Sequence, residues 1–476
     1  MKGKFFIAIK TIYENDNCCV KVGDKITSAF VATQGVKQGC ILSPLLFNIF
    51  LSDLPKIFHG TECRPAMLNN ERLSCLLWAD DLVLLSESNE GIQEMISKLG
   101  KYSSMNNLEI NVEKTKAMIF NKSGRLNMMT YKLDNQFIRT TNSYKYLGFI
   151  ITPSGEILSG LKDLKVRALR AFYKLKWKMR HLFKQHLSMT LFLFEVLIKP
   201  ILLYASDFWG CLKMPKNNPI ENVHIRFCKD ILGVQKQTTN VGVLLELGEI
   251  PITIFAKKNC IKNYIRINVS KRANNILTAS VQIPTVTLSP WLSAVKNCSN
   301  SIGIGTPLNK SAHQRAFIRM KDIFHQESFT DIHRSDSKLR TYGEIKTEIG
   351  IEKYLLNPLR LDERSAITKL RLSNHDLMIE KGRHLKIDKS LRFCPFCPNL
   401  IETEHHFLLH CKTFEILRGE LFTNVGNIIP HFYRLPEPEK FIILVGNNYA
   451  LPYMGNFWCK AFQARKFLCE KHKNYE

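Results

Sequence analysis

Two adjacent carboxylates, Asp80 and Asp81, interrupt an apolar stretch of the chain that reads LSCLLWADDLVLLSES over residues 73–88. The runs on either side have the length and composition of short strands, so the stretch predicts a buried β-hairpin that turns at the acid pair. Burying carboxylates without a partner is costly, and a divalent cation such as Mg²⁺ would offset that cost. An exposed Asp-Asp turn without metal is the alternative.

The charge balance favours a polyanionic partner. The 476 residues include 67 Lys and Arg but only 42 Asp and Glu, which gives a net charge of +25. Nucleic acid is the commonest partner of such a basic chain. The alternative is a basic surface that only water covers.

Cysteine usage and hydropathy indicate an intracellular protein, nuclear or cytoplasmic. The 14 cysteines are mostly scattered, which is typical of a reduced compartment and not of a disulfide scaffold. The most apolar stretch, residues 191–205, contains Glu195, Lys199 and Pro200. It therefore predicts a buried helix and no membrane span.

The first 152 residues predict a mixture of strands and helices. Residues 17–33 alternate around a Gly-Asp turn and predict a hairpin, and residues 40–58 predict a helix that begins near Ser43 and Pro44. The periodicity of residues 89–108 predicts an amphipathic helix. We expect one strand within residues 109–120 and another within residues 144–152.

From about residue 156 the pattern becomes helical. An apolar stripe steps by three and four residues through Leu161, Leu164, Ala168, Ala171, Leu175, Met179 and Leu182. Most cations of this segment fall off the stripe: Lys162, Lys165, Arg167, Arg170, Lys174, Lys176, Lys178 and Arg180. The pattern favours phosphate contact, and an ordinary solvated face is the alternative.

A second group of residues has the spacing of a zinc site. Cys394 and Cys397 form a Cys-x2-Cys half-site, and His406 and Cys411 complete a closed set of four ligands. His405 or His410 could replace His406 or Cys411, and unmetallated buried thiols are a further alternative.

Several segments, taken in order, resemble the reverse transcriptases of non-LTR (LINE-type) retrotransposons. They begin with TQGVKQGCILSPLLFNIFLSDL at 33–54 and LLWADDLVLLSES at 76–88, and they continue with LEINVEKTKAMIF, YKYLGFIIT, VLIKPILLYASDFWG, FCKDILGV and LLELGEIP between residues 108 and 251. The resemblance covers residues 5–255 and resumes over 365–415. It implies an RNA-directed DNA polymerase that extends a DNA primer on an RNA template with dNTPs and Mg²⁺.

The resemblance also implies roles for individual residues. Asp80 and Asp81 would be catalytic metal ligands. The residues near template, nucleotide and phosphates would be Gln38, Gly39, Ser43, Pro44, Lys114 and Lys116, although surface charge is an alternative for the two lysines. Trp78 stands where the family usually carries Phe or Tyr. A C-terminal zinc-knuckle-like motif of these proteins favours Cys394, Cys397, His406 and Cys411 as a structural Zn²⁺ site.

The expected fold class is α+β, with a partial palm of antiparallel sheet and helices followed by helical regions. The predicted divisions are a palm over residues 1–152, a thumb-like region over 153–260, a connector over 261–380 with a linker near 294–312, a zinc-knuckle-like unit over 381–415 and a tail over 416–476.

One carboxylate of the family's active site is not found in this sequence. In relatives it lies in a motif ahead of the QG…SP segment, whereas the acids here before residue 33 are Glu14, Asp16 and Asp24, in polar, turn-like surroundings. We therefore expect a chain truncated before its first catalytic Asp and inactive by itself. A non-enzymatic nucleic-acid-binding remnant and a frame without function are the alternatives.

Overall fold

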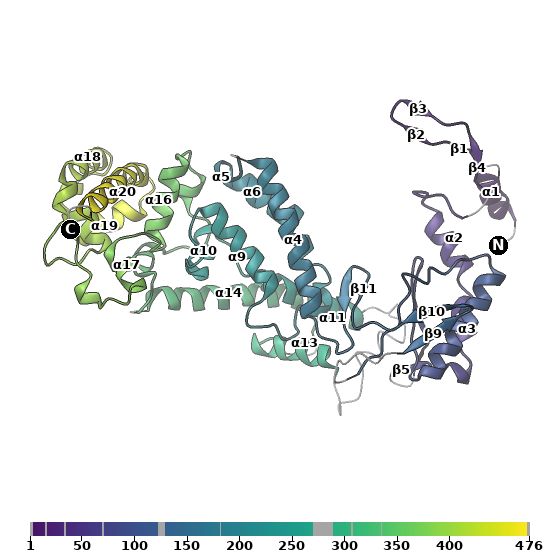
Figure 1. Cartoon of the computed structure of the whole chain (residues 1–476). Helices are drawn as coiled ribbons and strands as arrows, with labels where there is room; N and C mark the ends of the chain where they lie inside the picture. Colours follow the sequence, from purple (N-terminus) through teal and green to yellow (C-terminus); the bar gives the residue numbers. More distant parts are fainter. Residues whose placement is uncertain are drawn as a thin grey trace. The chain divides into compact units, whose positions relative to one another are not determined.

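The computed structural model describes residues 3–14, 17–32, 35–68, 71–121, 129–180, 182–269, 289–305, 308–334 and 336–473. The chain divides into two compact units (Figure 1). Unit 1 comprises Met1–Ala117 with Asn127–Thr140, and unit 2 comprises Met118–Leu126 with Thr141–Glu476. Unit 1 mixes short strands and helices, and unit 2 is mostly helical, so the α+β prediction is confirmed.

The strands of unit 1 pair two by two in antiparallel ladders. The strands are β1 (Asn17–Cys18), β2 (Lys21–Val22), β3 (Lys25–Ile26), β4 (Phe30–Val31), β5 (Ala66–Leu68), β6 (Glu71–Leu73), β7 (Cys75–Trp78), β8 (Asp81–Leu84), β9 (Thr130–Leu133) and β10 (Gln136–Arg139). The helices are α1 (Lys4–Tyr13), α2 (Ser43–Phe50), α3 (Asn89–Met105) and the 3-10 turns η1 (Leu54–Phe58) and η2 (Thr61–Cys63).

Helix α3 organises the core of unit 1. Its N-cap is Ser88, whose hydroxyl accepts a hydrogen bond from the Gly91 backbone N–H at 3.0 Å. Gly91 is required because a Cβ there would lie 2.5 Å from the carbonyl oxygen of Cys63. Met95 of α3 packs among buried residues of η1, and Ile96 packs against β9 and β10.

In unit 1 the structure confirms the predicted hairpin at 17–33 and the predicted helix at 89–108. The prediction of a strand at 109–120 is wrong. Residues 112–114 form a turn, and Ala117 alone makes a bridge, with Thr140. The helix at Ser43 and Pro44 is also confirmed, but it ends at Phe50, and a separate 3-10 turn follows with Pro55 in its first positions.

Unit 2 begins with a hairpin and continues with helices. Its strands are β11 (Tyr144–Tyr146) and β12 (Phe149–Ile151). Its longer helices are α4 (Leu158–Met179), α9 (Pro219–Leu232), α10 (Asn240–Leu247), α11 (Ile252–Val269), α13 (Pro290–Ser301), α14 (Ala312–His333), α16 (Leu361–Arg371), α18 (Glu415–Gly426), α19 (Glu437–Gly446) and α20 (Leu451–Lys473). Its shorter helices are α5 (Leu182–Gln185), α6 (Leu187–Leu193), α7 (Lys199–Leu202), α8 (Ser206–Trp209), α15 (Arg340–Ile345) and α17 (Met378–His384). Single turns of other helix types complete the unit: η3 (Phe194–Ile198), η4 (Lys353–Leu356), η5 (Lys389–Leu391), η6 (His406–His410), η7 (Lys412–Phe414) and η8 (Phe432–Arg434).

The prediction of a single strand within 144–152 is wrong, because the segment folds back on itself. Leu147 and Gly148 both have positive φ angles, 45° and 81°, and form a two-residue turn between β11 and β12. Two positive φ angles in succession are the geometry of a tight hairpin turn.

Helix α4 follows the predicted apolar stripe closely. Leu161, Leu164 and Ala168 are fully buried, and the stripe also includes Phe172, which packs edge-on against Phe227 of α9. Leu182, predicted to continue the stripe, is exposed. The helix ends at Met179 and Arg180 has a positive φ angle, so the periodicity does not continue to Leu182.

Two other predicted segments have clear structures. The apolar stretch at 191–205 runs through α6, η3 and α7, with Phe194, Ile198 and Leu202 buried. Within the described part of the chain, no helix is long and apolar enough to cross a membrane. Residues 294–301 of the predicted linker belong to α13, where Val295 and Ser299 are buried, and residues 306–307 lie outside the described residues.

A fully buried ion pair joins distant parts of unit 2. Arg371 of α16 donates from Nε to Glu246 of α10 at 2.8 Å, and neither side chain is exposed to solvent. Tyr354 donates its hydroxyl to the same carboxylate at 2.6 Å, and Glu352 approaches Arg371 at 2.7 Å. The carboxylate of Glu246 thereby anchors α10 to α16.

We expect Glu246→Ala to lower the free energy of unfolding by about 3–5 kcal/mol, because it leaves the Arg371 charge buried without its main partner. Glu420→Ala is the matched control, because Glu420 forms an exposed pair with Lys460 at 3.4 Å. That control should cost less than about 1 kcal/mol. Urea unfolding of both variants checks the difference, and equal losses would contradict it.

Candidate functional site

The acid pair lies at the tip of a two-residue hairpin. Strands β7 and β8 pair in register from Cys75 and Leu84 to Trp78 and Asp81, so the turn consists of Ala79 and Asp80. Ala79 has a φ angle of 52°, as tight hairpin turns require. The hairpin prediction is therefore confirmed, and we call residues 75–84 the acidic hairpin.

The acid pair itself is not buried, contrary to the sequence prediction. Asp80 and Asp81 are both exposed, and Trp78, which pairs opposite Asp81, is 66% exposed. The hairpin is half-buried at Cys75 and Leu84, at its base, and leaves its tip in solvent. Neither carboxylate has an ion-pair partner among the described residues, so their oxygens are available to a cation.

The residues predicted around template and nucleotide lie before and at the start of α2. Gln38 and Gly39 form a turn in which Gly39 has a φ angle of 81°, which favours glycine. Ser43 is buried and donates its hydroxyl to the Lys37 carbonyl at 2.5 Å, while Pro44 occupies the first helical turn. In the described part of unit 1, no hydrogen bond or ion pair joins these residues to the acid pair.

Lys114 and Lys116 are exposed on the turn and loop that follow α3. The backbone N–H of Lys114 donates to Asn111 at 3.0 Å. Of the earlier acids, Glu14 pairs with Lys10 at 3.2 Å, Asp24 lies in the turn between β2 and β3, and Asp16 lies outside the described residues.

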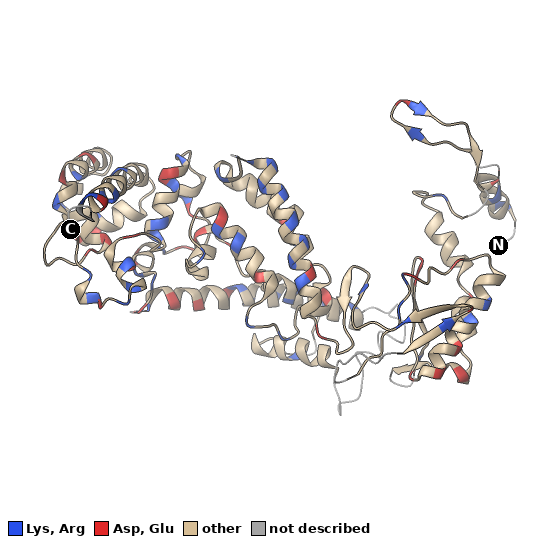
Figure 2. Cartoon of the chain, in the orientation of Figure 1, with Lys and Arg blue, Asp and Glu red and all other residues tan. Residues whose placement is uncertain are grey.

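The cations of α4 divide into two groups. Arg167 donates to the Gly148 carbonyl at 2.8 Å and pairs with Asp163, and Lys176 pairs with Asp230 at 2.6 Å. These two support the fold. The other predicted cations within α4 have no hydrogen-bond or ion-pair partner in the described residues, and they are Lys162, Lys165, Arg170, Lys174 and Lys178. Arg180 follows the end of the helix and lies 5.8 Å from the centre of the Trp177 ring. Figure 2 shows Lys and Arg along the length of α4.

The predicted zinc ligands converge in unit 2. Cys394, Cys397, His406 and Cys411 are all buried, and their ligand atoms lie within 4.8 Å of one another. The Sγ atom of Cys411 is 4.0 Å from that of Cys394 and 3.8 Å from that of Cys397. A tetrahedral site with Zn–S bonds of about 2.3 Å separates its sulfurs by about 3.8 Å, so the spacing fits zinc. We call these four residues the Cys/His cluster.

The structure brings His406, and not His405 or His410, to the three thiols. The Nε2 atom of His406 is buried without a hydrogen-bond partner in the described residues. His405 instead stacks on Phe441, with ring centroids 3.5 Å apart, and His410 approaches Glu437 at 3.3 Å. Both of these side chains are about two-fifths exposed, at 40% and 44%.

Local backbone geometry builds the Cys/His cluster. The chain folds back on itself around the first two thiols, so that Cys394 N–H donates to the Leu400 carbonyl at 2.7 Å. The other two ligands flank a π-helical turn, in which Cys411 N–H donates to the His406 carbonyl at 2.8 Å. This i to i+5 bond brings together residues that an α-helix would rotate apart.

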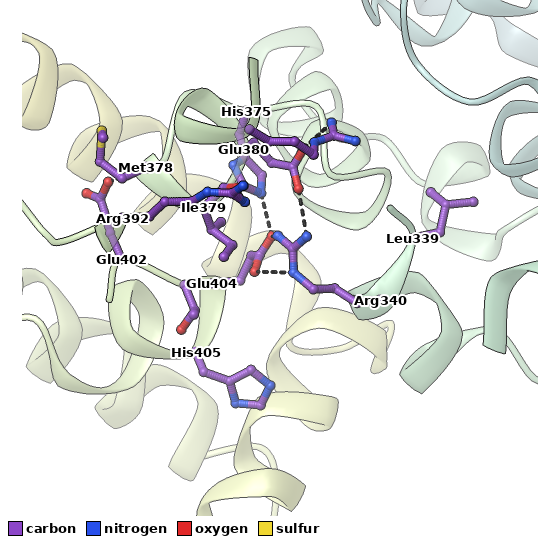
Figure 3. A network of polar contacts seen from close by, with 12 residues as sticks. Leu339, Arg340, His375, Met378, Ile379, Glu380, Arg392, Glu402, Glu404 and His405 are labelled. Carbon is purple, nitrogen blue, oxygen red and sulfur yellow. Dashed lines mark hydrogen bonds and ion pairs between the residues drawn. The ribbon is translucent and has the colours of Figure 1, made fainter. Parts of the chain in front are cut away.

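Two buried carboxylates, Glu402 and Glu404, lie between Cys397 and His406 in the chain, and Figure 3 shows the polar network around them. Glu404 accepts from His375 at 2.9 Å and from Arg340 of α15, and Arg340 also donates to Glu380 of α17 at 2.7 Å. Glu402 accepts from both the Arg465 guanidinium and the Met378 backbone N–H, at 2.7 and 2.6 Å. The segment between the second and third ligands is thus tied to three helices.

The environment shifts two pKa values at this place. Burial by itself would raise the pKa of Glu404, but the hydrogen bond from His375 and the charges of His375 and Arg340 outweigh it and lower the pKa to about 2. Contact with the Cys394 thiol lowers the pKa of Cys411, which favours the thiolate that metals bind.

Comparison with known proteins concerns the part of the chain that carries the acidic hairpin. A family model described as reverse transcriptase (RNA-dependent DNA polymerase) matches residues 2–151, which include the acidic hairpin. Residues 2–151 are therefore similar to reverse transcriptases. The chain is 25% identical over 237 residues to a probable RNA-directed DNA polymerase from transposon BS of Drosophila melanogaster, covering 48% of this chain and 25% of that protein.

Two further relatives support the non-LTR resemblance. The RNA-directed DNA polymerase from mobile element jockey of Drosophila melanogaster is 23% identical over 48% of this chain and 25% of its own length. A retrovirus-related Pol polyprotein from retrotransposable element R2 of Popillia japonica is 28% identical over 36% of this chain and 30% of its own. The chain therefore spans about a quarter to a third of the reverse transcriptase relatives it matches. The resemblance to non-LTR retrotransposon reverse transcriptases is confirmed.

Sequence reasoning missed the residues that hold the cluster in place. Arg418 donates to the carbonyls of Leu408 and Cys411 and so fixes the last ligand. Arg465 and Arg340 reach Glu402 and Glu404 across more than 60 residues of sequence. Each reads as an ordinary surface arginine, so no local signal identified them.

We expect the Cys/His cluster to bind a metal and His406→Ala to abolish that binding, because one of the four predicted ligands is lost. His405→Ala is the matched control, since the adjacent imidazole packs on Phe441. Bound metal per chain, measured by elemental analysis of purified protein, should fall in the first variant alone. Retention of the metal in His406→Ala would show that the ligand set is different.

Glu404 should make stability depend on acid pH. Its pKa lies at about 2 in the folded chain, below the ordinary value of 4.5. Its contribution to the free energy of unfolding is therefore present above pH 4.5 and is lost as the pH falls toward 2. Glu404→Gln should unfold at lower urea concentration at pH 7 and should lack this part of the pH dependence. Parallel pH profiles for the two proteins would contradict the assignment.

Proposed function

We propose that this chain is the part of an RNA-directed DNA polymerase that carries the acidic hairpin and a structural zinc unit. The observation that carries the proposal is the match of residues 2–151 to reverse transcriptases, with Asp80 and Asp81 exposed at a hairpin tip inside the matched region. The reaction is the attack of a primer 3′-OH on the α-phosphate of a dNTP, directed by an RNA template, with release of pyrophosphate.

Asp80 and Asp81 would hold Mg²⁺ in this reaction. Mg²⁺ prefers oxygen ligands and keeps open positions for water and phosphate, and the two carboxylates have no competing cation partner among the described residues. Two ions would stabilise the attacking and the leaving oxygen. Gln38, Gly39, Ser43 and Pro44 would border the template and nucleotide, and Lys114 or Lys116 would approach phosphates.

The Cys/His cluster would hold a structural Zn²⁺. Four nitrogen and sulfur ligands leave no open position for substrate, which is typical of structural sites. The metal would tie the two-thiol turn to the π-helical turn, and the exposed neighbouring cations Lys386 and Lys389 would face nucleic acid. Helix α4 would contact the phosphate backbone through Lys162, Lys165, Arg170, Lys174 and Lys178.

A second candidate is a nucleic-acid-binding protein without polymerase activity. The metal-ligand groups of the described residues favour it. The only group among them of three or more potential ligands is the Cys/His cluster, and the acid pair belongs to no such group. Two-metal chemistry needs more carboxylates than the acid pair provides. We therefore propose that this chain by itself incorporates dNTPs slowly, since losing a ligand costs orders of magnitude in rate.

A primer-extension assay on an RNA template separates the two candidates. We expect slow Mg²⁺-dependent incorporation that Asp80→Asn abolishes. Asp134→Asn should leave it unchanged, because Asp134 also lies in an exposed two-residue turn of unit 1, between β9 and β10. Equal incorporation by wild type and Asp80→Asn would contradict the assignment.

The same samples test binding. Affinity for an RNA–DNA hybrid should fall steeply as salt rises, because backbone contacts release counterions. Salt-dependent binding with no incorporation in any sample would favour the second candidate. Absence of both would contradict both.

A further inference from the structure

Unit 2 contains a small polar pocket that the proposed function does not use. It lies beside the start of α10, the loop after α16 and the end of α17. Its polar lining includes Thr238, Thr239, Ser373, Lys338, Arg383 and His384. We call it the hydroxyl pocket.

The hydroxyl pocket contains buried donors that lack partners. Thr238 and Ser373 are only 6% and 9% exposed, and their hydroxyls have no hydrogen-bond partner among the described residues. The same holds for the Thr239 hydroxyl and for Nε of Arg383. Buried polar atoms are nearly always hydrogen-bonded, so four such atoms at one small pocket indicate a ligand that accepts hydrogen bonds.

The charge of the pocket selects an anion. Lys338, Arg383 and His384 line it, and no Asp or Glu does. Arg383 donates from Nη2 to Glu380 at 2.5 Å, and its Nε has no hydrogen-bond partner among the described residues. Thr239 is also the N-cap of the eight-residue helix α10, and its side chain makes no capping bond. The partial positive charge of a helix N-terminus further favours an anion.

We propose that the hydroxyl pocket binds a phosphate group. A tetrahedral oxyanion can accept from several hydroxyls and a guanidinium at once, whereas an apolar ligand or a cation leaves these donors unpaired. The phosphate is either a free ion or one phosphate of a nucleic-acid backbone. None of the residues that line the pocket belongs to the acidic hairpin or to α4.

Two variants and a control test the pocket. Thr238→Val removes one hydroxyl at nearly constant shape, and Lys338→Gln removes one exposed charge. Lys381→Gln is the control, because Lys381 is exposed on α17 outside the pocket lining. The thermal unfolding of each variant without ligand shows that it is folded.

Calorimetric titration with inorganic phosphate is the first measurement. We expect wild type and Lys381→Gln to bind, and Thr238→Val and Lys338→Gln to bind about tenfold more weakly, the loss for one hydrogen bond to a charged ligand. Titration with a single-stranded oligonucleotide is the second. If the pocket binds a phosphate of a nucleic-acid backbone and not the free ion, inorganic phosphate should bind neither wild type nor any variant. Thr238→Val and Lys338→Gln should then still lose affinity for the oligonucleotide.

The proposal is overturned if neither ligand distinguishes the pocket variants from Lys381→Gln. A Lys174→Gln variant distinguishes failure of the pocket proposal from failure of the proposed function, because it removes a cation of α4 and leaves the pocket intact. It should lose oligonucleotide affinity through α4 and keep the response to inorganic phosphate.

Discussion

Unit 2 depends on carboxylates that are removed from water and held by arginines from remote parts of the chain. Glu246, Glu380, Glu402 and Glu404 are each at most 2% exposed. An unpaired buried charge is very costly, so each must meet its guanidinium for the fold to form. The helices that carry them are thereby fixed in one arrangement, and the Cys/His cluster is positioned within it.

Local signals predicted the elements whose residues interact with near neighbours. Spacing or resemblance predicted the hairpin at Asp80, the helix α3 and the four members of the Cys/His cluster. The structure contains the hairpin and the helix, and it brings the four members of the cluster together. The errors have local physical causes. A positive φ angle at Leu147 turns one predicted strand into two, and one at Arg180 ends a predicted stripe.

What the sequence did not reveal is long-range. Arg371 and Glu246 are 125 residues apart, and neither lies in a pattern that marks it as buried. The hydroxyl pocket likewise takes Thr238, Lys338 and Ser373 from three separate segments. Exposure was also misjudged at the acid pair, because apolar flanks indicate that a hairpin has a buried base and say nothing about its tip.

The π-helical turn has a consequence for how this part of the chain can change during evolution. Its i to i+5 bond accommodates one residue more than an α-helical turn would. If these same residues formed an ordinary α-helix instead, the Cys411 thiol would move by about 100° around the axis, because it would lie five and not four α-helical steps after His406. Substitutions that restore the ordinary helix should therefore be rare in this short interval unless one residue is deleted with them.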